Sequence, residues 1–243
     1  MKTFKHTLQV GAGLALLVSG WSWANESGHA KTAAESWKPA TLRVALAEMP
    51  QGDIGRGKQL NEQLMCASCH GAAGIAPTGN WPQVAGQKAD YTYKMLLDYQ
   101  SGLRSEDNRS KLMLAAVEPM SQQDMADVAA YYASLPAPES VSGENQSVAA
   151  DAQDAHASAE ELVRKGDSKR LITACASCHG VRGQGGKKAA AALAGQNPKA
   201  FIRTMQLYKS GQRDNDVNQV MSQIARKLTD AEINLLATYY QTQ

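Results

Sequence analysis

A five-residue sequence, Cys-Ala-Ser-Cys-His, occurs twice in this chain, at residues 66–70 and 175–179. The two copies contain all four cysteines of the 243 residues. Two thiols three positions apart on a helical turn can each add to a vinyl group of one porphyrin, and the histidine that follows can ligate the iron. The repeat therefore predicts two covalently bound haem c groups. The predicted thioether residues are Cys66, Cys69, Cys175 and Cys178, and the predicted iron ligands are His70 and His179.

Two other chemistries use a Cys-x-x-Cys pair, the redox dithiol and the zinc site. Neither explains a histidine directly after the second cysteine in both copies. A zinc site would also need two further ligands in each half, and the histidines outside the motif are scattered at His6, His29 and His156. Haem attachment is the interpretation that accounts for every residue of the motif.

The first 24 residues have the three parts of a secretory signal peptide. Lys2 and Lys5 precede an apolar stretch from Leu8 to Trp23, and Ala24 stands before a polar segment. This stretch is shorter than the roughly 20 apolar residues that span a bilayer comfortably, which argues against a membrane anchor. We expect cleavage after Ala24 and a periplasmic protein, because covalent haem attachment in bacteria takes place outside the cytoplasm.

The two halves resemble each other well beyond the haem motif, which indicates a duplicated domain. Three more pairs of segments match at an offset of 109 or 108 residues: 84–87 with 193–196, 99–104 with 208–213, and 131–132 with 239–240. We predict a signal peptide at 1–24, an N-terminal extension at 25–50, domains at 51–135 and 160–243, and a linker at 136–159. Within the extension, Trp37 and residues 41–48 are candidates to dock on a domain.

The repeat also selects a second iron ligand in each half. Of the nine methionines, only Met113 has a methionine, Met221, at the equivalent position of the other half. If both sites are built alike, these two thioethers are the axial ligands. The remaining methionines of the first half are interpreted as ordinary core residues: Met65, Met95, Met120 and Met125.

Apolar residues recur at helical spacing, and no alternating strand pattern of useful length is found. We therefore expect an all-α fold with two tandem domains, each wrapped around one haem. The expected helices include 53–68, 90–101, 160–177 and 198–210, with Gly102 and Gly211 ending the second and the fourth. Capping sequences at Ser121 and Thr229 predict the final helix of each half.

Each half runs in the order Cys-x-x-Cys-His-Gly, Ala-Gly-Gln, Ser-Gly-x-Arg, methionine and a final Tyr-Tyr helix. In tandem this order resembles the dihaem cytochrome c4 family over about residues 50–243. The resemblance implies class I cytochrome c domains with His/Met haems whose propionate edges face each other. It also implies that a carbonyl orients the proximal histidine; Pro82 fits in the first half, whereas the second has Ala191. Four recurring residues could bond propionates or serve in packing: Gln87, Gln196, Arg104 and Arg213.

Two protein ligands on each iron favour electron transfer over catalysis, so no catalytic residue is expected. A dihaem peroxidase would leave one haem without its methionine, and a thiosulfate-oxidising dihaem enzyme of similar layout would need a distal cysteine. Expected partners are redox proteins such as a membrane cytochrome complex, a terminal oxidase or a periplasmic dehydrogenase, with no nucleic acid and with room for peripheral membrane contact. The alternative is a dedicated electron-transfer subunit of a periplasmic complex that oxidises sulfur compounds or alcohols.

The two predicted domains differ in charge. Residues 51–135 have 7 Lys/Arg against 9 Asp/Glu, a net charge of −2, whereas residues 160–243 have 13 against 7, a net charge of +6. We expect the haem of the more positive half to hold its electron more strongly, and this half to approach an acidic partner. Lysines that merely solvate the surface are an equally good explanation of the charge.

Overall fold

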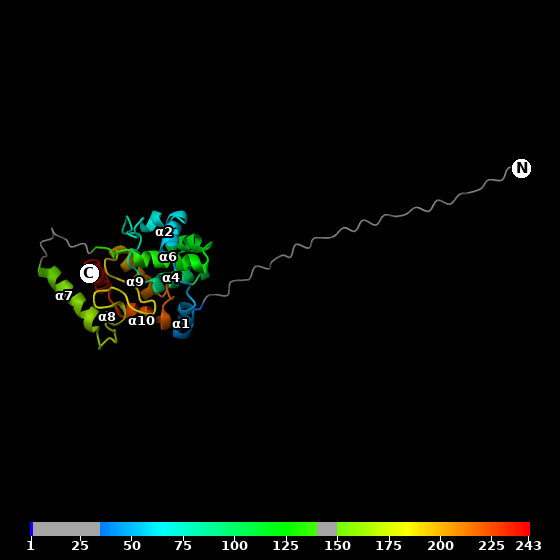
Figure 1. The fold of residues 1–243 in the computed structure, drawn as a ribbon. Coiled ribbons are helices and arrows are strands. Elements are labelled where there is room, and N and C mark those ends of the chain that lie inside the picture. Colours follow the sequence, from blue (N-terminus) through cyan, green and yellow to red (C-terminus); the bar gives the residue numbers. More distant parts are fainter. Residues whose placement is uncertain (2–34, 140–149) are drawn as a thin grey trace. The chain divides into compact units, whose positions relative to one another are not determined.

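The computed structural model describes Met1 and residues 35–139 and 150–243, the side chains of residues 150–153 excepted (Figure 1). The predicted signal peptide lies outside this part. Within it the chain is helical, and the only β pairing is an isolated bridge between Asp167 and Ile172. The predicted all-α class is therefore confirmed.

The helices of the first half are α1 (Pro39–Ala47), α2 (Ile54–Gln63), α3 (Cys66–His70), α4 (Ala89–Ser101), α5 (Asn108–Val117) and α6 (Gln122–Ser134). Those of the second are α7 (Ala150–Lys165), α8 (Ala176–His179), α9 (Pro198–Ser210), η1 (Val217–Gln219), α10 (Val220–Lys227) and α11 (Asp230–Gln241).

In the first half, α2 and α6 pack closely because a glycine faces the partner helix. A Cβ on Gly57 would lie 2.0 Å from the carbonyl oxygen of Asp127, so a larger residue would force the helices apart. The core beside this contact holds Tyr93 from α4 and Met125 and Val128 from α6, each at most 2 % exposed. This close crossing of α2 and α6 supports the segment that leads into α3.

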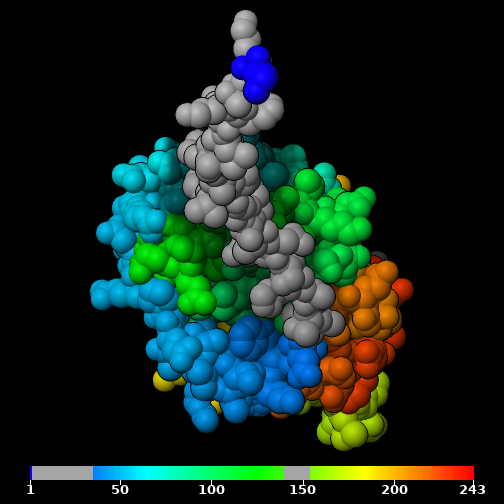
Figure 2. Space-filling model, turned by 90° about the vertical axis from the view of Figure 1, so that its right-hand side faces the viewer, coloured from blue at the N-terminus to red at the C-terminus, as the bar shows by residue number. Residues whose placement is uncertain are grey.

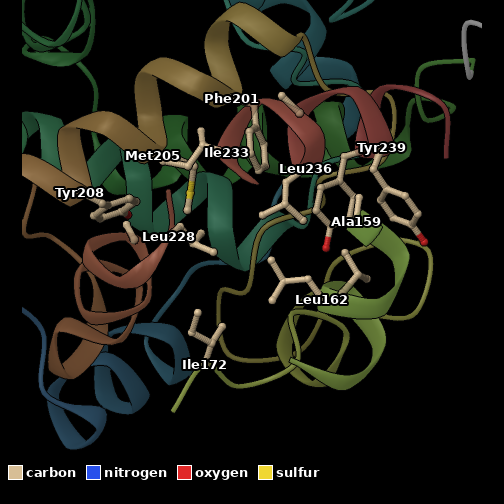
Figure 3. Packing of buried hydrophobic residues seen from close by; sticks show 14 residues of the cluster. Ala159, Leu162, Ile172, Phe201, Met205, Tyr208, Leu228, Ile233, Leu236 and Tyr239 are labelled. Carbon is tan, nitrogen blue, oxygen red and sulfur yellow. The ribbon is translucent and has the colours of Figure 1, made fainter. Parts of the chain in front are cut away.

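The core of the second half is built from α7, α9 and α11 (Figure 3). Phe201 and Met205 of α9 point toward Ile233 and Leu236 of α11, and Leu162 of α7 closes the cluster from the other side. These side chains are all at most 8 % exposed. The duplicated sequence thus gives each half a hydrophobic core of its own.

Both helices expected to run into the haem motifs are interrupted. In the first half α2 ends at Gln63, and Met65 takes a left-handed conformation with φ 57° and is 70 % exposed. Its interpretation as a core residue is wrong, whereas Met95, Met120 and Met125 are buried as predicted. In the second half α7 ends at Lys165, and an extended turn separates it from α8.

Part of the predicted linker is also helical, because α7 begins at Ala150 rather than near residue 160. The alanine-rich sequence there has high helix propensity, and Ala159 is 2 % exposed against the second core. Residues 140–149 of the linker lie outside the described part, and the predicted bounds of the domains stay a prediction. No helix in the described part is long and apolar enough to cross a membrane.

The end of the N-terminal extension docks on both halves, as expected for Trp37 and α1. The Trp37 indole donates a hydrogen bond to Asp98 of α4 at 2.5 Å, and its carbonyl accepts one from the Asn218 amide of η1 at 3.2 Å. Leu42 of α1 is 4 % exposed. Figure 2 shows this blue segment lying beside the orange surface of the second half. The extension therefore forms contacts across the boundary between the halves.

Candidate haem sites

The residues predicted to hold each haem lie together on one short helix. In the first half Cys66, Cys69 and His70 all belong to α3. In the second, Cys175 is the N-cap of α8, which carries Cys178 and His179. Each helix stops directly at a glycine with a φ of about 80°, Gly71 at 77° and Gly180 at 83°. Each histidine is thereby set at the end of a single turn that also carries the two thiols.

Both histidine rings are oriented by a backbone carbonyl twelve residues later. His70 Nδ1 lies 3.0 Å from the carbonyl oxygen of Pro82, and His179 Nδ1 lies 2.8 Å from that of Ala191. A carbonyl can only accept, so Nδ1 carries the proton in both rings and the lone pair of Nε2 is free for a metal. Burial lowers the pKa of both histidines, which favours the neutral form that ligates iron. The missing proline in the second half does not remove the carbonyl contact.

A buried tyrosine lies beside the first cysteine of each motif, a neighbour that the haem motif itself does not predict. Tyr132 neighbours Cys66 and donates a hydrogen bond to Asn61 Oδ1 at 2.7 Å. Tyr240 neighbours Cys175, and apart from this thiol its buried hydroxyl has no hydrogen-bond partner in the described part of the chain. Burial raises the pKa of both thiols. The repeated Tyr-Tyr pair was the signal that could have found these residues.

The partly buried thiols of Cys66 and Cys175, the histidines with a free Nε2 and a buried tyrosine hydroxyl beside Cys175 are a set of groups that fits a porphyrin bound through thioethers. The candidate axial methionines lie on other elements. Met113 is on α5 and Met221 on α10, and each is partly buried against the hydrophobic core of its own half. Their role as iron ligands stays a prediction.

The residues considered for the propionates are engaged elsewhere. The carboxamides of Gln87 and Gln196 form hydrogen bonds with the backbone of the opposite half. Arg104 pairs with Glu106 at 2.5 Å and also donates to Tyr99. Arg213 is 4 % exposed and donates to Asn215. All four residues therefore take part in packing or hydrogen bonding within the protein, and their role toward the propionates stays a prediction.

Comparison with known proteins agrees with this geometry. The chain matches the family model described as cytochrome c over residues 54–136 and again over 167–243. It is 31 % identical to cytochrome c4 of Thiocapsa roseopersicina over 80 % of this chain and 95 % of that protein. The chain belongs to the dihaem cytochrome c4 family.

Two further relatives of this cytochrome c4 family member are informative. A protein of Stutzerimonas stutzeri (strain A1501) named thiosulfate dehydrogenase electron acceptor is 34 % identical over 84 % of this chain and 93 % of its own length. The crystal structure of reduced recombinant cytochrome c4 from Pseudomonas stutzeri superimposes with a TM-score of 0.65 at 27 % identity, covering 79 % of this chain and 98 % of that one. Membership of the family means that the chain has two tandem cytochrome c domains with covalently bound haem c, and that it is an electron carrier rather than an enzyme.

Proposed function

We propose that this cytochrome c4 family member is exported to the periplasm and passes electrons between redox proteins through two His/Met-ligated haems. The observation that carries the ligation is the pair of equivalent contacts from His70 to Pro82 and from His179 to Ala191. Each leaves Nε2 of the histidine ring free on the same turn as two thiols. A haem iron held in this way supplies a one-electron couple at each site.

The chain's own residues then keep the two sites alike in ligation and closed to other ligands. The cysteines fix the attachment, and the backbone carbonyls hold the rings at a set angle and raise the basicity of Nε2. Met113 and Met221 are proposed to take the sixth position of each iron, which leaves no open site for a substrate. Reversible transfer of one electron per site follows from this arrangement.

The donor that the comparisons favour is a dehydrogenase of sulfur compounds. The relative from Stutzerimonas stutzeri, which is named as the electron acceptor of thiosulfate dehydrogenase, aligns over most of both chains. A dedicated acceptor for such an enzyme is therefore the specific form of the proposal. A broader carrier that also serves a membrane cytochrome complex or a terminal oxidase is the second candidate, in keeping with relatives named only cytochrome c4.

The ligation is tested by optical and redox titration of the holoprotein beside Met113→Ala and Met221→Ala. Each variant should lose the low-spin His/Met spectrum at one haem, and the potential of that haem should fall, because the thioether favours ferrous iron. Met65→Leu, at an exposed methionine, is the control and should titrate as the wild type. Normal His/Met spectra at both haems in both alanine variants would contradict the assignment. The same titration tests whether the second haem has the higher potential.

A further inference from the structure

Two glutamines join the halves in a reciprocal pattern. Gln87 of the first half accepts a hydrogen bond from the Ala192 amide at 2.7 Å through Oε1 and donates to the Ala192 carbonyl at 3.1 Å through Nε2. Gln196 of the second half makes the same two bonds with Gln83, at 2.8 Å and 3.1 Å. Residues 87 and 196, like 83 and 192, are related by the repeat offset of 109. The same pair of hydrogen bonds between the halves therefore occurs twice.

Each carboxamide is itself held firmly before it reaches across. Oε1 of Gln87 also accepts from the Lys88 amide at 2.9 Å, and Oε1 of Gln196 accepts from the Asn197 amide at 3.0 Å. The preceding glycine is fixed too, because the Gly86 amide donates to the Tyr132 carbonyl at 2.9 Å. Gln87 is 7 % exposed. Water is thus largely excluded from the Gln87 contact, where a bond to a buried peptide group counts for more than at the surface.

The peptide groups to which the two glutamines are hydrogen-bonded are the ones whose carbonyls orient the haem histidines. The carbonyl of Ala191 accepts from His179, and the amide of Ala192 belongs to the same planar peptide unit. Likewise the carbonyl of Pro82 accepts from His70, and the amide of Gln83 shares its plane. Since a peptide unit is rigid and its C=O and N–H point in opposite directions, holding the N–H fixes the direction of the C=O.

From this geometry we propose that Gln87 and Gln196 are positioning residues that act across the boundary between the halves. Gln87 of the first domain fixes the carbonyl that orients His179, and Gln196 of the second domain fixes the carbonyl that orients His70. Each haem histidine is therefore set in part by the other domain. A bond to the amide also polarises the peptide unit and strengthens its carbonyl as an acceptor, so the basicity of each histidine depends on the opposite glutamine.

The second haem site should depend more on its glutamine hydrogen bonds than the first. The first site has Pro82 to restrict its backbone, whereas Ala191 follows two residues with left-handed backbone, Lys188 at φ 60° and Ala189 at φ 58°. Loss of Gln87 should therefore be felt more strongly at His179 than loss of Gln196 at His70.

The experiment is a crossed comparison of Gln87→Met and Gln196→Met in the full holoprotein. Methionine keeps the length of the side chain and removes both hydrogen bonds. The haem methyl shifts of the ferric protein, assigned to each half by contacts with its residues, report the orientation of each histidine, and redox titration reports each potential. Gln87→Met should shift the signals and the potential of the haem on His179, and Gln196→Met those of the haem on His70. Gln63→Met, at an exposed glutamine of α2, is the matched control and should change neither haem.

Amide hydrogen exchange gives a readout that does not depend on the haem spectra. Gln87→Met should speed exchange at Ala192 by roughly three- to tenfold and leave Gln83 protected, and Gln196→Met should do the reverse. If a methionine variant fails to fold, Gln87→Glu and Gln196→Glu keep the acceptor and remove only the donor, and the crossed pattern should persist in weaker form. Equal effects on both haems, or a larger effect on the haem of the variant's own half, would overturn the proposal. Such a result would leave the assignment of the methionine ligands unchanged, because that assignment is tested by the separate alanine variants.

Discussion

Asp127 shows how one buried carboxylate ties two helices of the first domain together. Its side chain has no exposed surface. The carboxylate accepts hydrogen bonds from the Asp53 amide at 2.7 Å and from the Gln123 side chain at 2.8 Å, and it forms an ion pair with Arg56. Desolvation raises the pKa of this carboxyl, and the hydrogen bonds and Arg56 more than offset it, so the pKa lies below the ordinary 3.8. The ionised form is thus favoured by folding.

Replacing Asp127 with alanine should destabilise the protein by about 2–3 kcal/mol, because three donors lose their acceptor. A folded-state pKa below that of the unfolded chain means that the contribution is present above pH 4 and is lost as the pH falls further. Denaturant unfolding at pH 7 and at pH 3 measures both effects, with Glu62→Ala, at an exposed position, as the control. A difference between wild type and Asp127→Ala that stayed the same at pH 3 would contradict the assignment of the effect to the ionised carboxylate.

The site residues that could be predicted from the sequence are those whose chemistry dictates a fixed spacing. Thioether attachment requires Cys66, Cys69 and His70 on one turn, and the repeat supplied the second copy. The roles of Gln87 and Tyr240 could not be predicted, since they depend on which backbone group lies opposite in space. The repeat marked these positions as special without saying what they contact.

At the scale of elements, helix ends were predicted well where a side chain or a glycine ends the helix locally. Gly102 and Gly211 are left-handed C-caps with φ of 81° and 76°, and both Ser121 and Thr229 form capping boxes. The interruption at Met65 was missed, because no glycine or proline marks it. Met65 takes a left-handed backbone there, and helix propensity alone does not predict such a break.

The capping box of α11 gives a test at this scale. The Thr229 hydroxyl accepts a hydrogen bond from the Glu232 amide at 3.1 Å, and the Glu232 carboxylate accepts one from the Thr229 amide at 2.8 Å. The same carboxylate pairs with Arg170 at 2.6 Å. Thr229→Ala should cost about 1 kcal/mol of stability, as loss of an N-cap usually does. The bond from Arg170, followed by those from Thr229, lowers the pKa of Glu232 to about 2, so its contribution is present above pH 4.5 and is lost as the pH falls toward 2.

Thermal unfolding of Thr229→Ala and Glu232→Gln over pH 2 to 7 checks this prediction. The stability difference between wild type and Glu232→Gln should shrink as the pH falls, whereas the effect of losing the Thr229 hydroxyl should persist in part, because the hydroxyl does not titrate. Thr238→Ala, at an exposed threonine in the middle of the same helix, is the control. Equal stability of Thr229→Ala and wild type would mean that packing against α7 and α9 alone holds the start of α11.

For the whole molecule, part of the charge difference between the halves lies beside the second haem motif. Exposed basic residues Arg182 and Lys187 follow His179 in the loop, and the equivalent residues of the first half are Ala73 and Thr78. A basic rim around one haem motif and not the other gives the two sites different fields, even though their ligands match. This asymmetry supports a second haem that holds its electron more strongly and a partner that docks on the second half.

An acidic electron donor should therefore reduce the protein faster at low ionic strength than at high. Steering by the basic rim acts within about a Debye length, so the bimolecular rate should fall by about tenfold between low and moderate salt. Arg182→Glu with Lys187→Glu should slow the reaction at low salt and flatten its salt dependence. Lys58→Glu with Lys111→Glu changes the net charge equally on exposed positions of the first half and should have a much smaller effect. Stopped-flow reduction by a purified thiosulfate dehydrogenase measures all three proteins. Equal slowing by the two double variants would show that net charge alone, rather than the rim beside the second haem, governs the encounter.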